Sequence, residues 1–359
     1  MKILLDAPLN GLSLGNVSFN IIREFHKSNV DLRIFPVGEI DLKSYSISDS
    51  LKGYIETAIN KRLDFLRPDV PSLRIWHLNG SENRKNKEQY LFTFYECNAP
   101  TEVEMAFCKA QDRTIFSSTY AKDHFSRGGA SNVSFVPLGF DEDFAVTKKN
   151  YLQDITHFGL MGKFENRKHT QKIIRTWLKK YGNNNKYQLS CCVNNPFFKP
   201  DQMKLLIDAA TQGQHYSNLN FLPHLTTNSE VNELLNAIDI DLTGLSGGEG
   251  WNLPAFNSTC LGKWSVLLNE TSHKDWATEK NSILVQSSGT MPAEDGVFFK
   301  NGQPFNQGEF FTWTEDEAIA GMEAAESKVG EINTEGLKLG KTFTYKNTVD
   351  SLLKIIFNN

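Results

Sequence analysis

The sequence predicts an α/β protein made of two domains, each with a parallel β-sheet covered by helices. The length of 359 residues exceeds one typical domain and fits two of ordinary size. The order strand, glycine-containing loop, helix, strand opens the chain and returns near residues 155–193 and 238–268. This order produces parallel strands joined by helical crossovers. A hydrophobic content of 40% with 22% charged residues is typical of a globular chain.

The first half contains six apolar runs that predict strands. Apolar residues recur at helical spacing between residues 17 and 25, and a further helix is expected over residues 119–125. Gly11 and Gly15 lie in the loop after the first strand, where ligands of parallel sheets collect, although a plain turn explains them equally. The expected strands are residues 3–5, 30–37, 73–78, 89–95, 114–118 and 133–138.

A polar stretch at residues 147–153 predicts a linker, after which the strand pattern starts again. We therefore expect an N-terminal domain over residues 1–146 and a C-terminal domain over residues 150–342. The remaining residues, 343–359, have an amphipathic helical pattern. Strands of the second domain are expected at residues 155–161, 187–193, 238–242, 264–268, 283–286 and 297–299, with helices beginning near residues 170, 205, 227, 254 and 319.

Charge and cysteine usage narrow the class of protein. The net charge of −4 gives no electrostatic basis for nucleic-acid binding. The five cysteines are odd in number and form no CxxC pair or metal-ligand spacing, which predicts a reducing compartment. No run approaches the roughly 18 apolar residues of a membrane span, and the N-terminus lacks the apolar core of a signal peptide. We expect a cytoplasmic protein without a transmembrane segment, with peripheral membrane contact left open.

The stretch from residue 246 to residue 254 is the strongest candidate for a binding loop. It follows an apolar strand and contains Gly247, Gly248, Glu249 and Gly250, and Pro254 suits the first turn of a helix. Glycines let backbone N–H groups approach a ligand closely, and a helix N-terminus favours negative charge. A phosphate-bearing ligand fits this loop, and Glu249 could accept hydrogen bonds from sugar hydroxyls. Short glycine motifs are unspecific, so an ordinary strand-to-helix turn is the competing interpretation.

A second candidate loop begins the C-terminal domain. Gly162, Lys163, Arg167 and Lys168 lie between the strand at 155–161 and the next helix. This is where a second domain would present cations to a phosphate. A solvated basic loop before a surface helix is the alternative.

Several polar residues of the chain have less specific signals. His77 and Glu96 follow strands of the first domain, where a structural histidine and a helix-capping acid are the competing interpretations. Asp239 and Asp241 have the spacing of a metal-binding pair, but one spacing match is weak, and we expect no metal. The acidic residues 141–143 are expected to form a solvated hinge between the domains.

Taken together, five segments resemble the GT-B glycosyltransferases, most closely the large retaining family 4. That family begins its second domain with Gly-Arg and a later Lys, and has Glu-Gly-Phe-Gly-Leu-Pro-x-x-Glu near its end. It closes its first domain with Val-Pro-x-Gly-Val-Asp and a later Phe, and a subset has Tyr-x-x-Glu and Pro followed by Pro-Ser. The counterparts here are residues 162–168, 249–257, 136–144, and 95–100 with 117–120. Their order and spacing match over most of the chain.

The resemblance implies two Rossmann-like domains that face each other across a cleft and bind a nucleotide sugar, mostly through the second domain. It implies that Lys163 and Lys168 hold the diphosphate without a metal, that Glu249 orients the donor sugar, and that Gly15 faces the diphosphate from the first domain. Glu96 and His77 are the candidates for a catalytic position in the first domain, and residues 343–359 would pack back on that domain. The implied donor-binding residues are Gly162, Gly247, Gly248, Gly250, Trp251, Asn252, Leu253 and Asn257.

The sequence departs from the family pattern at three positions. Asn257 replaces the second Glu of the family motif, the residue that holds the ribose in that family. Lys163 replaces an Arg, so the bidentate guanidinium fork is lost. Asn252 replaces a Gly. The expected function is a retaining transfer of a hexose from a UDP- or GDP-sugar to a glycan, lipid or small-molecule acceptor, with no cofactor. The alternatives are a nucleotide-sugar epimerase or hydrolase of the same fold, and a non-catalytic nucleotide-sugar-binding module.

Overall fold

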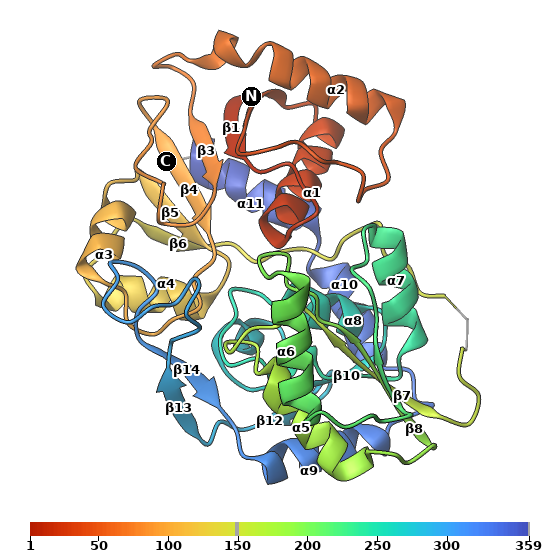
Figure 1. Ribbon diagram of the computed structural model, residues 1–359. Coiled ribbons are helices and arrows are strands. Elements are labelled where there is room, and N and C mark those ends of the chain that lie inside the picture. The colour runs from red at the N-terminus through yellow and green to blue at the C-terminus, as the bar shows by residue number, and fades with distance from the viewer. Residues whose placement is uncertain (148–150, 358–359) are drawn as a thin grey trace.

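A computed structural model describes residues 1–147 and 151–357. Two six-stranded parallel sheets with flanking helices make up the two domains, as Figure 1 shows. This confirms the α/β class and the parallel sheets. Of the expected linker at 147–153, residues 148–150 lie outside the described residues, as do the last two residues of the expected terminal helix.

The N-terminal sheet has the strand order β2-β1-β3-β4-β5-β6. Each neighbouring pair is parallel, so the carboxyl ends of all six strands meet at one edge. Its elements are β1 (Lys2–Ala7), α1 (Ser13–Lys27), β2 (Asp31–Pro36), α2 (Asp49–Asn60), β3 (Ser72–Ile75), β4 (Gln89–Thr93), α3 (Glu102–Lys109), β5 (Arg113–Phe116), α4 (Thr119–Arg127) and β6 (Val133–Phe135).

The C-terminal sheet has the order β12-β11-β10-β7-β8-β9 and is also parallel. Its elements are β7 (Thr156–Met161), α5 (Thr170–Tyr181), β8 (Tyr187–Cys192), α6 (Pro200–Thr211), β9 (Leu219–Phe221), α7 (Asn228–Ala237), β10 (Ile240–Asp241), α8 (Leu253–Cys260), β11 (Trp264–Leu268), β12 (Ile283–Val285) and α9 (Glu315–Glu326).

The helices form where the sequence places an apolar stripe against a sheet. In α5, Ile173, Ile174 and Trp177 are fully buried, while Lys179 and Lys180 in its last turn are exposed. These apolar residues recur three and four positions apart, which brings them onto one face of the helix. Helix α1 does the same with Val17, Ile21, Ile22 and Phe25.

The end of the chain returns to the first domain. Helix α10 (Thr334–Thr342) packs on α8, and α11 (Tyr345–Phe357) packs on α1, as Figure 1 shows. Val349, Leu352 and Ile356 join the core of the N-terminal sheet. The polypeptide therefore crosses between the two domains twice, once between β6 and β7 and once before α11.

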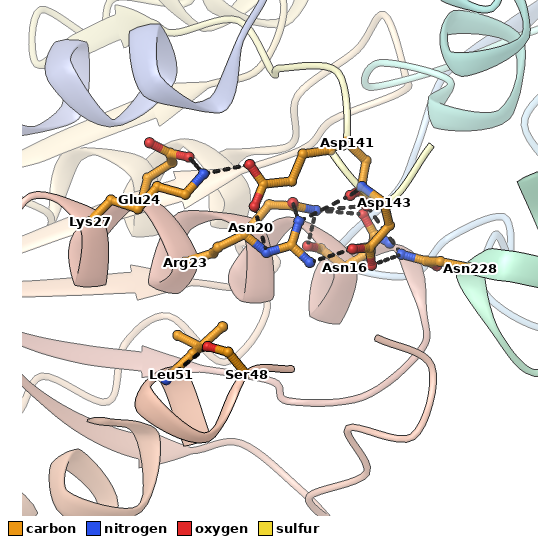
Figure 2. Close-up of polar contacts among 11 residues, drawn as sticks. Asn16, Asn20, Arg23, Glu24, Lys27, Ser48, Leu51, Asp141, Asp143 and Asn228 are labelled. Atoms are coloured by element: carbon orange, nitrogen blue, oxygen red, sulfur yellow. Dashed lines mark hydrogen bonds and ion pairs between the residues drawn. The ribbon is translucent and has the colours of Figure 1, made fainter. Parts of the chain in front are cut away.

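A buried polar cluster beside the first crossing contradicts the expected solvated hinge. Figure 2 shows Arg23 of α1 reaching Asp141 (3.4 Å) and Asp143 (2.7 Å), and the Asn228 amide at the start of α7 donating to both. Asp141 is only 1% exposed, whereas Glu142 stays half exposed. An ionised carboxylate can be buried when a charge and hydrogen bonds compensate for its lost hydration. Arg23, which the sequence interpretation did not connect to these acids, supplies that charge.

The prediction of a strand at residues 297–299 was wrong. These residues lie in the loop between β13 (Gly289–Pro292) and β14 (Glu309–Thr312). The Asp295 carboxylate accepts N–H groups of Val297, Phe298 and Phe299 at 2.8–2.9 Å, which curls the backbone into a turn. Phe299 of this loop packs against the first domain together with Phe310 of β14.

Helices α2 and α3 were not anticipated, although Thr101 and Glu104 form a capping box at the start of α3. In Figure 1 the β13–β14 loop lies against α3 and α4. There the Thr101 hydroxyl donates to the Pro304 carbonyl at 2.5 Å, and the N–H of Asn306 donates to Glu104 at 2.8 Å. This loop is thus a contact of the second domain with the first. Among the helices that the structure describes, none is long and apolar enough to cross a membrane.

Candidate functional site

The two loops singled out in the sequence lie side by side at the carboxyl edge of the C-terminal sheet. One follows β7 and the other follows β10, which is a direct neighbour of β7. The N–H of Gly247 donates to the Arg167 carbonyl at 2.8 Å and joins the loops. Gly162 has φ +136°, where a side chain would be strained, and an added Cβ would lie 3.1 Å from the Lys168 side chain. Gly162 therefore lets Lys168 fold back over the strand end toward the glycine loop.

Two cations of the first loop bind the Glu249 carboxylate of the second. Lys168 Nζ lies 2.7 Å from Oε1, and an Arg167 guanidinium nitrogen lies 3.2 Å from Oε2. Burial opposes ionisation of Glu249, but Lys168 and then Arg167 outweigh it and lower its pKa to about 2. Glu249 is therefore a carboxylate at neutral pH, with both oxygens held.

Lys163 is the third cation of this region and lies nearer to solvent. Its ammonium pairs with Glu165 at 2.8 Å and sits 5.3 Å and 5.1 Å from the ring centres of Phe197 and Phe298. Cations are attracted to aromatic faces at such distances. Phe298 belongs to the β13–β14 loop, so three separate segments place this ammonium.

The first domain contributes Glu96 and His77 to the same region. Glu96 approaches Arg167 at 4.0 Å. Burial raises the pKa of Glu96, and Arg167 opposes that rise. His77 is accessible to solvent, yet the surrounding protein, with Lys163 and Arg167 nearby, lowers its pKa to about 4. Lys163 and Arg167 are the charges that act on His77, so His77 lies on the side of the first domain that faces these cations.

The glycine loop is packed directly against the first domain. An added Cβ at Gly248 would lie 2.9 Å from the Glu96 carbonyl oxygen, and one at Gly250 would lie 2.7 Å from Phe94 Cβ. The Ser117 hydroxyl donates to the Gly250 carbonyl at 2.6 Å. These glycines therefore allow close approach of the two domains in this arrangement, a role that their spacing in the sequence did not reveal.

Replacing Gly250 by alanine is expected to force the domains apart locally. The methyl group would overlap Phe94, and overpacking of this kind costs about 1–3 kcal/mol of unfolding free energy. Urea unfolding measures the loss. The matched control is Gly53→Ala in α2, where nothing lies within 4 Å of the added Cβ, and that variant should be as stable as the wild type or more so. Equal stability of the Gly250 variant and the wild type would contradict the close contact.

The residues after Gly250 have mainly structural positions. The Trp251 ring is 2% exposed and packs on Phe256 and Phe343, in an apolar cluster shared by the two domains. Asn252 takes φ +66°, a left-handed conformation that Asn tolerates, which explains how it replaces a glycine. Its amide donates to the Thr243 carbonyl and bonds His273. Leu253 begins α8.

Asn257 and Gly15 complete the expected donor-binding set. Asn257 lies in α8 and is 5% exposed, and its Oδ1 has no hydrogen-bond partner among the described residues. A buried amide oxygen without a partner is costly unless something pairs with it. Gly15 lies buried in the first turn of α1, where an added Cβ would meet the Asn10 carbonyl oxygen at 2.1 Å. Gly15 thus allows this turn to pack on the loop after β1.

His169 is a buried neighbour of the site that the sequence interpretation did not single out. Its Nε2 lies 2.8 Å from the Phe311 carbonyl oxygen and beside Gly247. Burial lowers its pKa to about 4, from an ordinary value of 6.5. Because the folded-state pKa lies below the unfolded one, this group leaves stability unchanged above pH 6.5 and removes stability as the pH falls from 6.5 to 4.

The variant His169→Gln should lose less stability in acid than the wild type. Between pH 7 and pH 4.5 we expect its unfolding free energy to decrease by roughly 2–3 kcal/mol less, because no imidazole must take up a proton. Urea unfolding at both pH values measures this difference, and any cost of the substitution itself cancels. An equal decrease in both proteins would show that His169 is not held neutral.

The aspartate pair at 239 and 241 does not form a cluster of metal ligands. Asp239 accepts the N–H of His157 at 2.9 Å, and Asp241 is 1% exposed with its pKa raised to about 6 by burial. Within residues 1–147 and 151–357, no group of three or more His, Cys, Asp or Glu side chains could hold a metal ion.

Comparison with known proteins gives structural matches only. The sequence matches no protein-family model and no curated protein. The fold is similar to that of sucrose-phosphate synthase from Thermosynechococcus elongatus, with a TM-score of 0.70 and 10% identity over 99% of this chain and 98% of that one. It is also similar to HepE of Anabaena in complex with UDP, with a TM-score of 0.68 and 12% identity over the full length of both chains.

A third match is α,α-trehalose 6-phosphate synthase from Burkholderia multivorans, with a TM-score of 0.66 and 12% identity over 99% and 96% of the two chains. HepE matches in complex with UDP-glucose as well, at 13% identity. Coverage of whole chains shows that both domains and their arrangement are shared. At such low identity the likeness establishes the fold alone.

Proposed function

The chain has the GT-B fold, and on this premise we propose that it is a retaining glycosyltransferase that moves a hexose from a UDP- or GDP-sugar to an acceptor hydroxyl. One observation carries the proposal. Charged and polar side chains of the two domains converge at the edge where ligands of parallel sheets bind. The second domain contributes Lys163, Lys168 and Glu249, and the first contributes His77 and Glu96. The complexes of HepE with UDP and UDP-glucose support a nucleotide-sugar donor.

The chemistry requires a stabilised leaving group. The bond from the anomeric carbon to the diphosphate oxygen breaks with its electron pair going to the diphosphate. A bond from that carbon to the acceptor oxygen forms, and the proton of the acceptor hydroxyl passes to the departing diphosphate. Lys163 and Lys168 would neutralise the charge that develops on the diphosphate, an electrostatic role that needs no metal. Glu249 would hold hydroxyls of the donor sugar, and Glu96 and His77 would lie on the acceptor side.

The existing ion pairs set a condition on donor binding. Lys168 pairs with Glu249 and Lys163 with Glu165, so the diphosphate would take over ammonium groups that carboxylates now hold. Gly248 and Gly250 also touch Glu96 and Phe94. Donor entry would therefore separate the two domains at this contact, and closing them again would exclude water from the reaction.

The remaining donor contacts are proposed for backbone and amide groups. The phosphates would be approached by the loop glycines Gly162, Gly247, Gly248 and Gly250. The start of α8 would add Trp251, Asn252 and Leu253, and Gly15 of α1 would face the phosphates from the first domain. Asn257 would meet the ribose, supported by an Oδ1 that no other described residue pairs with. We propose a glycan, lipid or small-molecule acceptor, with peripheral membrane contact where the acceptor is a lipid, and no nucleic acid.

We propose domain limits of 1–146 and 150–342, with 343–359 belonging to the first domain, supported by the packing of α11 on α1. A cytoplasmic location is supported by five cysteines that are all buried free thiols.

A thermal-shift screen of UDP- and GDP-sugars tests the proposal. A ligand of the folded state at a hundredfold excess over Kd adds about 2.7 kcal/mol of stability and raises Tm. For any sugar that does so, incubation with and without a panel of acceptors separates transfer from hydrolysis or epimerisation, and binding without any product indicates a non-catalytic module. If no UDP- or GDP-sugar raises Tm, the proposed donor class is wrong.

A further inference from the structure

Arg167 is the most heavily engaged side chain of the candidate site, although the family resemblance assigns the diphosphate only to Lys163 and Lys168. Its guanidinium donates to the Gly248 carbonyl at 2.5 Å and lies 3.2 Å from both Glu165 and Glu249. Its own carbonyl accepts the N–H of Gly247. The side chain is only 8% exposed. Arg167 therefore holds the glycine loop at its backbone and at its carboxylate.

Arg167 also reaches across to the first domain. The guanidinium nitrogen that lies 3.2 Å from Glu249 is 4.0 Å from Glu96. The backbone of Glu96 lies close to Gly248, because a Cβ added to Gly248 would touch the Glu96 carbonyl oxygen. One planar guanidinium thus lies between a carboxylate of each domain, at the point where the glycine loop meets the first domain.

The charges of this cluster balance only when the domains are together. Three cations, Lys163, Arg167 and Lys168, meet three carboxylates, Glu96, Glu165 and Glu249. Separation of the domains removes Glu96 and leaves a surplus positive charge on the second domain. A buried guanidinium is stable when carboxylates compensate for its desolvation, so Glu96 favours the closed arrangement.

We propose that Arg167 is a positioning residue: it fixes the orientation of the Glu249 carboxylate and, through Glu96, makes that orientation depend on contact between the domains. This inference rests on the glycosyltransferase function proposed above. Lys168 alone could neutralise Glu249, but a single ammonium does not fix the plane of a carboxylate. A guanidinium with several donors in a rigid fork can hold Glu249, Glu165 and the Gly248 carbonyl at the same time.

The contact with Glu96 provides a readout that does not depend on catalysis. Glu96 faces Arg167 and Lys163 as cations and Glu249 and Glu165 as anions, and Arg167 is the strongest influence that holds its pKa down. The titration of Glu96 can be followed by carboxyl ¹³C NMR of glutamate-labelled full-length protein, with its resonance assigned from Glu96→Gln. Arg167→Gln should move the Glu96 midpoint to higher pH, and Arg167→Lys should move it much less.

Kinetics with the nucleotide sugar found in the screen form the second arm. Arg167→Gln should lower kcat by about 10²-fold, as expected when a reacting geometry is misplaced, and Arg167→Lys should lower kcat while it keeps the charge. The control is Arg175→Gln, an exposed arginine of α5 that bonds the Ala209 carbonyl and should change neither quantity. If Arg167→Gln does not fold, Arg167→Lys decides the question through kcat.

The outcomes separate this inference from the proposed function. A wild type that transfers no sugar refutes the proposed function, whereas the Glu96 midpoint still tests the link between the domains. An unchanged Glu96 midpoint in Arg167→Gln overturns that link. Reduced kcat in Arg167→Gln with an unchanged Glu96 midpoint would indicate a merely structural role and overturn the proposal, as would full kcat in both Arg167→Lys and Arg167→Gln.

Discussion

Replacing Lys168 by alanine is expected to lower kcat for sugar transfer by roughly 10²–10³-fold, the usual effect of removing one preorganised group that stabilises developing charge. Lys168 is 13% exposed and lies 2.7 Å from Glu249, so it can move to a diphosphate without leaving the site. Arg167 continues to neutralise Glu249 in the variant, and the protein should stay folded. Steady-state kinetics with the donor from the thermal-shift screen measure the loss, and circular dichroism verifies the fold.

The matched control for Lys168 is Lys179→Ala. Lys179 lies in α5, pairs with Glu315 and is more than half exposed, so its removal changes the net charge equally but leaves the site intact. Its kcat should equal that of the wild type. Equal turnover in the Lys168 variant would show that this ammonium does not act on the leaving group.

Glu249→Gln is expected to lower kcat by a similar 10²–10³-fold and also to destabilise the fold. The amide keeps the shape of the side chain but loses the charge that Lys168 and Arg167 share. Breaking a buried pair by removal of one partner costs about 3–5 kcal/mol, because the remaining charge is uncompensated. Urea unfolding at pH 7 and kinetics measure the two effects. Glu315→Gln, which removes a half-exposed acid, serves as the control.

The acid response of the Glu249 variant gives an independent check. The folded-state pKa of Glu249 is about 2, below its ordinary value of 4.5, so its ion pairs stabilise the protein above pH 4.5 and this stability is lost as the pH falls toward 2. The variant lacks this contribution, and its unfolding free energy should therefore fall less between pH 5 and pH 3. An identical acid profile would contradict the ion pairs, whatever the kinetics show.

Much of the fold could be predicted because it depends on local patterns. The apolar runs at 155–161 and 264–268 became β7 and β11, and the periodic apolar residues of α1 and α5 became helices with those residues buried. Failures occurred where tertiary contacts overrode the pattern. Residues 297–299 resemble a strand, yet the Asp295 side chain and the packing of Phe299 on the first domain turn them into a loop.

The candidate site likewise has a part that local patterns predicted and a part that they did not. Motifs and strand ends identified five of its residues, which the structure brings to one region: Lys163, Lys168, Glu249, Glu96 and His77. Arg167 was named only as one of the cations of its loop, and His169 was not identified, since a residue beside a motif gives no signal of which partner it will meet. The burial of Asp141 was missed for the same reason, because Arg23 lies 118 positions away in the sequence.

The sequence by itself determined the two parallel sheets, the loops at their carboxyl edges and the charged residue types that those loops contain, because strand and helix patterns and short glycine motifs depend on near neighbours along the chain. Only the tertiary structure decided that Gly248 and Gly250 touch Glu96 and Phe94, and that Arg167 lies between Glu249 and Glu96. These contacts join residues more than 70 positions apart, and their distances depend on how the two domains pack.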